Sequence, residues 1–313
     1  MEALIRLVEQ DTAGDPLTDE KWTRKTTTAL AEELKAQGFS VGPDTVARLL
    51  RQQRYTLKAN RKRLSEGSDP DRDRQFRYLR RVRKLFVRLG LPVISVDTKK
   101  KELVGNFKNP GRRWRRQHQD VKDHDFPSKA LGHAIPYGIY DWRYNDGYVV
   151  VGTSHETGAF AVACIRRWWL EVGHQRYAGA KVLLIEADCG GGNDSRRWEW
   201  KLALQAFADE FGLTILVTHY PPGASKWNPI EHRMFSLISI HWAAEPLVSY
   251  DLILFLIRGT RSKTGFRCEA CLDTTEYPTG GKISKAQRAT IRLERRRFLP
   301  RLNYAVLPHD PPK

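Results

Sequence analysis

The stretch Leu91-Pro-Val-Ile-Ser-Val-Asp97 decides the fold, because it is a short run of apolar, β-branched residues that ends in an acid. Such runs favour β-strands. A second run of the same kind, Lys181-Val-Leu-Leu-Ile-Glu-Ala-Asp188, also ends in an acid. Ligand sites in open α/β sheets gather at strand ends, so two adjacent strands would bring Asp97 and Asp188 together. We therefore expect a site at this edge of a sheet.

Strand and helix patterns alternate around these two runs. Strand patterns cover residues 135–142 and 148–153, with a hairpin turn predicted at Asn145-Asp-Gly147, and a further strand covers 213–218. Helical patterns cover residues 157–172, 196–211 and 229–242. Three strands are thus followed by helix, strand, helix, strand and helix. This order predicts an α/β fold with a mixed sheet flanked by helices.

The N-terminal region carries a pattern typical of a helix-turn-helix. One predicted helix covers residues 26–38 and stops at Gly38, and a second covers residues 44–53 after a short turn. The polar side chains of the second helix, Arg48, Arg51 and Gln52, are candidates for DNA contact. A small helical hairpin that packs between domains would show the same pattern, so both interpretations stay open.

Positive charge is concentrated in one quarter of the chain. The 313 residues include 53 Lys and Arg against 36 Asp and Glu, and residues 48–122 hold 24 basic and 7 acidic side chains. Residues 71–88 read as a helix with 8 Lys or Arg and 2 Asp. A solvated surface helix is the alternative, but the imbalance favours contact with phosphates. A nucleic acid is the first partner to test.

Several classes of protein are excluded by composition. Apolar runs such as residues 252–257 are far shorter than the ~18 residues that span a bilayer, and the N-terminus lacks the layout of a secretory signal. Four cysteines are too few for a disulfide scaffold, and Cys268-Glu-Ala-Cys271 has no second pair to complete a zinc site. We expect a cytoplasmic protein with no membrane partner.

Glu231 is the third acid that could join Asp97 and Asp188. Three hard oxygen ligands suit Mg²⁺ or Mn²⁺, and a pair of such ions serves phosphodiester displacement. Each acid also has a simpler explanation. A strand-end Asp can lie in a solvated turn, and Asn228, Pro229 and Glu231 together match an N-terminal helix cap. The pattern alone favours the cap for Glu231.

Several longer strings resemble one protein family. They are Val93-Ile-Ser-Val-Asp-Thr-Lys-Lys-Lys-Glu-Leu-Val-Gly-Asn-Phe-Lys108, His124-Asp-Phe126, Ile135-Pro-Tyr-Gly138, Phe160-Ala-Val162, Ile165-Arg-Arg-Trp-Trp169 and Pro221-Pro-Gly-Ala-Ser-Lys-Trp-Asn-Pro-Ile-Glu-His-Arg233. Over residues 22–304 the chain resembles the ISAzo-type insertion-sequence transposases, which are DDE enzymes with an RNase H-like catalytic fold. The resemblance implies that Asp97, Asp188 and Glu231 are the catalytic, metal-binding acids.

The resemblance also implies an activity and its partners. A transposase of this kind cleaves phosphodiester bonds at the element ends and joins the freed 3′-hydroxyl to target DNA, using Mg²⁺ or Mn²⁺, with two ions expected. Its partner is double-stranded DNA, on which such enzymes usually act as homodimers. We expect further DNA contacts from basic residues near the first acid: Lys99, Lys100, Lys101, Arg112, Arg113, Arg115 and Arg116.

The expected domain organisation follows from these motifs. It comprises a helix-turn-helix region over residues 1–64, a basic linker helix over 65–90, an RNase H-like catalytic domain over 91–260 and a basic extension over 261–313. The family usually has Gly where this chain has Cys189, so a larger side chain is expected near the metals. The alternative function is a shortened, catalytically weak product of such an element that binds DNA.

Overall fold

The computed structural model describes residues 1–10, 12–14, 21–23, 25–57, 70–224 and 227–310. The chain divides into two units, Met1–Leu64 and Ser65–Lys313. The expected boundary near residue 64 lies outside the described residues. The second unit takes in the segments that the sequence interpretation treated as a linker helix and a C-terminal extension, because their helix and strands pack on one sheet.

The first unit is built mainly from three helices, α1 (Glu2–Gln10), α2 (Thr27–Ala36) and α3 (Pro43–Gln52), with a short hairpin of β1 (Thr12–Gly14) and β2 (Lys21–Thr23). The Thr26 side chain caps α2 by accepting from the Ala29 backbone N–H. Leu30 and Leu34 of α2 pack against Val46 of α3 in a small apolar core. The two helices predicted from the sequence are therefore confirmed.

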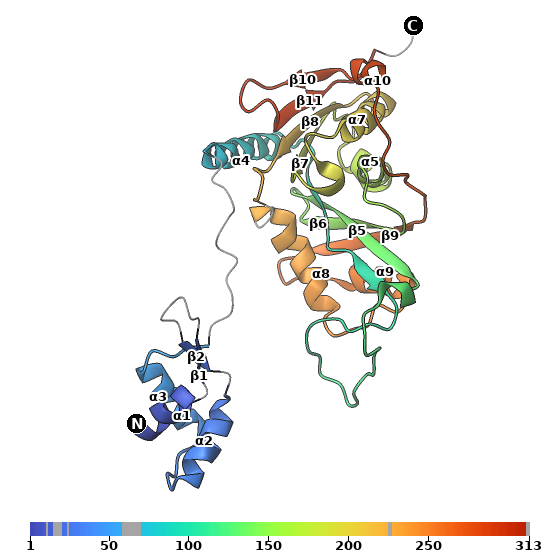
Figure 1. Cartoon of the computed structure of the whole chain (residues 1–313). Helices are drawn as coiled ribbons and strands as arrows, with labels where there is room; N and C mark the ends of the chain where they lie inside the picture. The colour runs from blue at the N-terminus through green and yellow to red at the C-terminus, as the bar shows by residue number, and fades with distance from the viewer. Residues whose placement is uncertain (11, 15–20, 24, 58–69, 225–226, 311–313) are drawn as a thin grey trace. The chain divides into compact units, whose positions relative to one another are not determined.

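Within the described residues, nine strands make up the sheet of the second unit, in the order β10-β11-β8-β7-β3-β5-β6-β9, with β4 beside β5 (Figure 1). The three central strands β3, β7 and β8 are parallel, while β5 pairs antiparallel with β3, and β6 pairs antiparallel with β5. This confirms the prediction of a mixed sheet flanked by helices. The strands are β3 (Val93–Thr98), β4 (Glu102–Val104), β5 (Gly132–Asp141), β6 (Asp146–Gly152), β7 (Val182–Ala187), β8 (Thr214–His219), β9 (Arg267–Asp273), β10 (Leu293–Arg295) and β11 (Asn303–Val306).

Helices cover both faces of this sheet. On one face α5 (Gly158–Trp168) and α7 (Trp198–Phe211) pack over Ile94 and Val96. The other face carries α4 (Arg72–Arg88), α9 (Tyr250–Gly259) and the helix that runs from residue 229 into α8 (Ser236–His241). Because side chains alternate along a strand, Ser95 and Asp97 point to this second face.

Shorter helical segments complete the second unit. They are η1 (Pro127–Lys129), the π-helix η2 (Trp169–Gly173), α6 (His174–Arg176), η3 (Gly191–Asn193), the π-helix η5 (Glu231–Phe235) and α10 (Lys285–Ala289). In the described part of the chain, no helix is long and apolar enough to cross a membrane.

The predicted hairpin between β5 and β6 forms, but its turn lies slightly earlier than expected. The turn covers residues 142–145, and Asp146 and Gly147 already belong to β6. Asn145 has a φ of 53°, which is the left-handed conformation that Asn tolerates better than most residues. Asn145 therefore ends the turn.

The basic helix α4 is fixed to the sheet by one buried charge. The Arg83 guanidinium donates to both oxygens of Glu186, at 2.8 and 2.9 Å, and Glu186 is fully buried on β7. Tyr220 and Trp142 each donate to Glu186 at 3.1 Å, and Arg83 also stacks on the Trp142 ring. The Arg83 guanidinium thus binds a buried partner, whereas neighbouring arginines such as Arg80 and Arg81 are exposed to solvent.

Candidate active site

Asp97 lies near the end of β3, where little of its side chain is exposed. One carboxylate oxygen, Oδ1, accepts from the Thr98 backbone N–H at 2.8 Å, and Oδ2 accepts from the Asn228 side-chain amide at 2.8 Å. Burial raises the pKa of Asp97 well above its ordinary value, and the charges of Asp188 and Glu231 raise it further. The three acids predicted from the sequence therefore influence one another electrostatically.

Asp188 follows the last residue of β7. The backbone approaches its carboxylate closely at Gly190, where an added Cβ would lie 2.8 Å from Asp188 Oδ2. Burial raises the pKa of Asp188; the Gly190 N–H and the Asn193 side chain oppose this, while Glu156 adds to it. In the described part of the chain, Asp188 Oδ1 is buried without a hydrogen-bond partner.

Glu231 lies in the first turns of the helix that starts at Pro229, where the backbone forms the π-helix η5. Its backbone N–H donates to the Asn228 carbonyl at 3.1 Å. Burial raises the pKa of Glu231, Lys99 and His232 lower it, and Asp188 raises it. The third acid thus belongs to the same electrostatic group as the other two.

Asn228 is a site residue that sequence reasoning saw only as a helix cap. Its side-chain oxygen accepts from the Ser95 hydroxyl at 3.0 Å and from the Ile230 N–H at 3.4 Å, while its amide donates to Asp97. The residue is fully buried. It therefore joins the strand of the first acid to the helix of the third, and the capping pattern in the sequence was the one signal of its presence.

The donor set fits a hard divalent cation. Neighbouring carboxylates that raise one another's pKa values are stabilised together when a cation compensates their charge. The buried Asp188 Oδ1, which has no hydrogen-bond partner in the described residues, has lone pairs that a cation would satisfy. In the described residues, no three His, Cys, Asp or Glu side chains lie close enough to hold a metal as they stand. Carboxylates without a cation between them repel one another, so we expect them to move closer together when an ion binds.

The three lysines after Asp97 differ in their surroundings. Lys99 is buried, pairs with Glu102 at 2.8 Å and lies over the Trp242 ring, so its charge is neutralised within the protein. Lys101 is exposed and pairs with Glu156 at 3.4 Å. Lys100 is exposed. Only Lys100 and Lys101 therefore present charge at the surface.

The four arginines of the loop between β4 and β5 fall into two pairs. Arg113 and Arg115 both bind Glu245, whereas Arg112 and Arg116 are exposed with no ion pair among the described residues. In the first unit, Arg48, Arg51 and Gln52 are exposed on α3. These side chains can reach an external partner.

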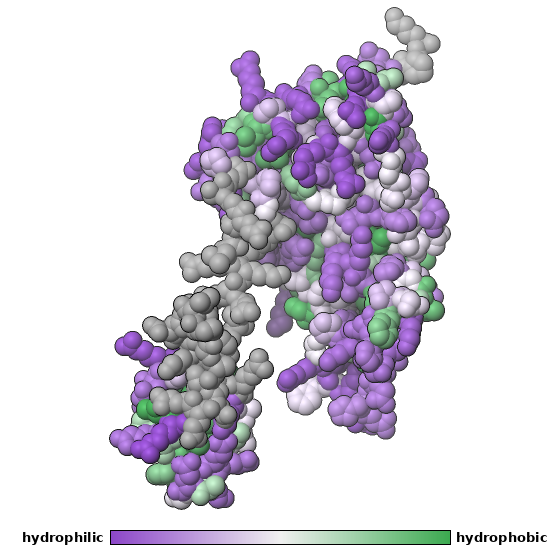
Figure 2. Space-filling model, in the orientation of Figure 1, coloured by the Kyte–Doolittle hydropathy of each residue, from purple (hydrophilic) through white to green (hydrophobic). Residues whose placement is uncertain are grey.

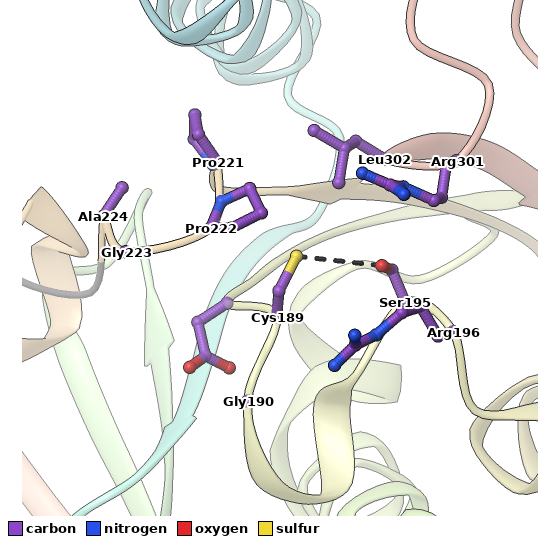
Figure 3. Close-up of a pocket in the computed structure, with 11 residues that line it drawn as sticks. Cys189, Gly190, Ser195, Arg196, Pro221, Pro222, Gly223, Ala224, Arg301 and Leu302 are labelled. Carbon is purple, nitrogen blue, oxygen red and sulfur yellow. Dashed lines mark hydrogen bonds between the residues drawn. The ribbon is translucent and has the colours of Figure 1, made fainter. Parts of the chain in front are cut away.

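A pocket of about 280 Å³ opens beside Asp188 (Figure 3). Cys189 lines it, with its thiol 3.7 Å from the Ser195 hydroxyl and 3.3 Å from the Tyr220 carbonyl. Burial raises the pKa of this thiol to about 11, so Cys189 is neutral at physiological pH. Its side chain occupies pocket volume that Gly would leave open. The remaining lining comes from Gly190, Arg196, Pro221, Pro222, Gly223, Ala224, Arg301 and Leu302.

Comparisons with known proteins point to one family. The family model described as the Rhodopirellula transposase DDE domain matches residues 3–308. No curated protein matches the sequence significantly. Among solved structures, the Mos1 transposase paired-end complex with left transposon end has a TM-score of 0.42 at 14% identity, covering 80% of this chain and 68% of that one. The Mos1 strand transfer complex has a TM-score of 0.43 at 16% identity, with coverages of 80% and 66%.

Proposed function

The chain belongs to the family of transposase DDE domains, and from this premise we propose that Asp97, Asp188 and Glu231 are its catalytic acids and its ligands for two Mg²⁺ or Mn²⁺ ions. The protein is a DNA transposase and depends on divalent metal. One observation carries the assignment of the acids: Asp97 is buried on β3, where the charges of Asp188, after β7, and Glu231, on the helix after β8, raise its pKa. Such an arrangement is costly without a cation.

The proposed reaction has two displacements at phosphorus. Water first attacks the phosphate at an element end and breaks its bond to the 3′-oxygen, which leaves as a 3′-hydroxyl. That hydroxyl then attacks a target phosphate, and a target 3′-oxygen leaves. Two bound ions would supply Lewis-acid stabilisation of the entering and leaving oxygens. The chain's own contribution is to hold Asp97 through the Asn228 amide and Asp188 through the Gly190 N–H.

A labelled duplex carrying the element's ends tests this function. The protein should nick one strand at the element boundary in Mg²⁺ or Mn²⁺ and leave the duplex intact in EDTA. Binding without nicking in either metal would instead favour the alternative of a catalytically weak DNA-binding product.

Asn228 should act as a positioning residue for Asp97. Substituting Asn228→Ala removes the donor to Asp97 Oδ2, so we expect the Mg²⁺ concentration for half-maximal nicking to rise by about 10- to 100-fold, as is typical for partners of metal ligands. Ser95→Ala is the matched control, because it removes the other side-chain partner of Asn228 and leaves the Asp97 contact in place. A lower melting temperature with an unchanged metal requirement would mean that Asn228 serves only as a helix cap.

The helix α3 is proposed to recognise the element end. Its exposed Arg48, Arg51 and Gln52 can bond to base edges or phosphates. Replacing Arg48 and Gln52 by Ala should cost ~1–3 kcal/mol of binding free energy per lost base contact on the cognate end, and much less on random DNA. Binding titrations on both duplexes measure this. Equal losses on the two would mean that α3 contacts phosphates only.

We further propose a homodimer on DNA as the working form. Two element ends must be processed together, and one active site per end requires two copies of the chain. The proposed setting is the prokaryotic cytoplasm. The four free thiols are consistent with a reducing compartment.

A further inference from the structure

The loop between β4 and η1 is anchored to the protein at its base (Figure 1). The Asn109 side chain donates to the carbonyls of Trp242 and Glu245, both at 3.1 Å, and the Ala244 N–H donates to the Pro110 carbonyl at 2.9 Å. These bonds hold the loop against the segment that follows α8. The loop is therefore positioned by the fold even though it has no regular secondary structure of its own.

Side chains alternate in the segment Arg112-Arg-Trp-Arg-Arg116. Arg113 donates to Glu245 at 2.7 Å and to the His241 carbonyl at 2.6 Å, and Arg115 also binds Glu245. Arg112, Trp114 and Arg116, which lie between and beside them, are exposed. Trp114 in particular is fully exposed, at 103% of its reference area. The two paired arginines thus fix the backbone that presents the indole to solvent.

The exposed Trp114 side chain lies in a run of positively charged residues. Tryptophan is enriched at interfaces, because it combines a large apolar ring with a polar N–H. Here four arginines flank the ring, and no acid lies between Gly111 and Gln119. Figure 2 shows a mainly hydrophilic surface in this part of the second unit. Charge of this sign and density favours a polyanion, and an aromatic ring among arginines suits a partner with both phosphates and flat bases.

We propose that Trp114 stacks on a base displaced from the helical stack of bound duplex DNA, while Arg112 and Arg116 hold the adjoining phosphates. The proposal deepens the proposed function, since it names a contact to the DNA that this enzyme acts on. It does not involve the three acids. An exposed aromatic ring can serve as a wedge at a base step, and the cost of unstacking is least where a base is already unpaired.

A pair of duplexes tests the proposal without any cleavage. One is a perfect duplex and the other has the same sequence with a single bulged thymine, and both are titrated with the full chain in EDTA by fluorescence anisotropy. The wild-type protein should prefer the bulged duplex, because its thymine is already unstacked. Trp114→Ala should lose that preference and bind the bulged duplex about 5- to 150-fold more weakly, the range set by base–aromatic stacking. Trp114→Phe should restore part of the preference.

Two controls separate stacking from charge and from folding. Trp114→Ala should leave the slope of log affinity against log salt unchanged, whereas replacing Arg112 and Arg116 by Ala should flatten it by about 0.9 per lost phosphate contact. Phe255, exposed on α9, offers a matched aromatic control, and Phe255→Ala should bind both duplexes as the wild type does. Permanganate should oxidise the bulged thymine more slowly under wild-type protein than under Trp114→Ala.

Equal affinities of wild type and Trp114→Ala for the bulged duplex would overturn the proposal. So would a Trp114→Ala protein that dissociates into monomers in sedimentation while keeping its bulge preference, because the ring would then contact a second copy of the chain. A failure to nick DNA would bear on the three acids alone, since these titrations contain no metal.

Discussion

Substituting Asp97→Asn should lower the rate of metal-dependent nicking by at least about a thousandfold. The loss of one ligand removes several kcal/mol of transition-state stabilisation, and each 1.36 kcal/mol is a factor of ten in rate. DNA affinity should stay equal or rise slightly, because a negative charge near the phosphate is removed. Single-turnover nicking and a binding titration in EDTA measure the two effects separately.

The same substitution should stabilise the metal-free protein. Asp97 is buried beside Asp188 and Glu231, and their charges raise its pKa, so the neutral amide relieves repulsion. We expect a higher melting temperature in EDTA, and a smaller rise on adding Mn²⁺ than in the wild type. Asp251→Asn, an exposed acid on α9, is the matched control and should change neither nicking nor the Mn²⁺ response. If Asp97→Asn nicks DNA at the wild-type rate, Asp97 is not a catalytic residue.

The substitution Arg83→Ala should destabilise the protein by about 3–5 kcal/mol, the usual cost of leaving one member of a buried ion pair without its partner. Glu186 is fully buried, and Arg83 is its one cationic partner among the described residues. Burial already raises the pKa of Glu186, against the influence of Arg83, Tyr220 and Trp142. Urea unfolding at neutral pH gives the free energy of unfolding directly.

Two variants make this stability prediction specific. Arg81→Ala removes an exposed arginine from the same helix and should change the free energy of unfolding by no more than about 0.5 kcal/mol. Replacing both Arg83 and Glu186 by Met should recover much of the loss, because no buried charge then remains. If Arg83→Ala and Arg81→Ala unfold alike, α4 is not fixed to the sheet through Glu186.

Local patterns in the sequence predicted much of this molecule. The strands that carry Asp97 and Asp188 were predictable because β-branched runs followed by an acid are short-range signals. The helix after Pro229 was predictable from its cap. The sequence offers two interpretations of Glu231, as part of a helix cap or as a catalytic acid. In the structure, it is Asn228 that both caps the helix and binds Asp97.

Contacts between distant residues could not be predicted in this way. Asn228 and Asp97 are 131 positions apart, and Arg83 and Glu186 are 103 apart, so no local pattern links them. A basic helix with an apolar stripe predicts a surface element, but not that one arginine is buried. The sequence interpretation likewise assigns β9 and β11 to an extension, because their pairing with β6 and β8 depends on residues far away in the chain.

Iron-directed cleavage of the polypeptide tests the central claim most directly, because it reports which residues surround one bound divalent ion. The protein is incubated on duplex DNA with Fe²⁺, ascorbate and peroxide, and the radicals formed at the metal cut the backbone nearby. We predict breaks next to Asp97, Asp188 and Glu231 together, suppressed by excess Mg²⁺ and absent in Asp97→Asn. Breaks at only one of the three acids, or breaks that persist in Asp97→Asn, would contradict a single metal site built from these carboxylates.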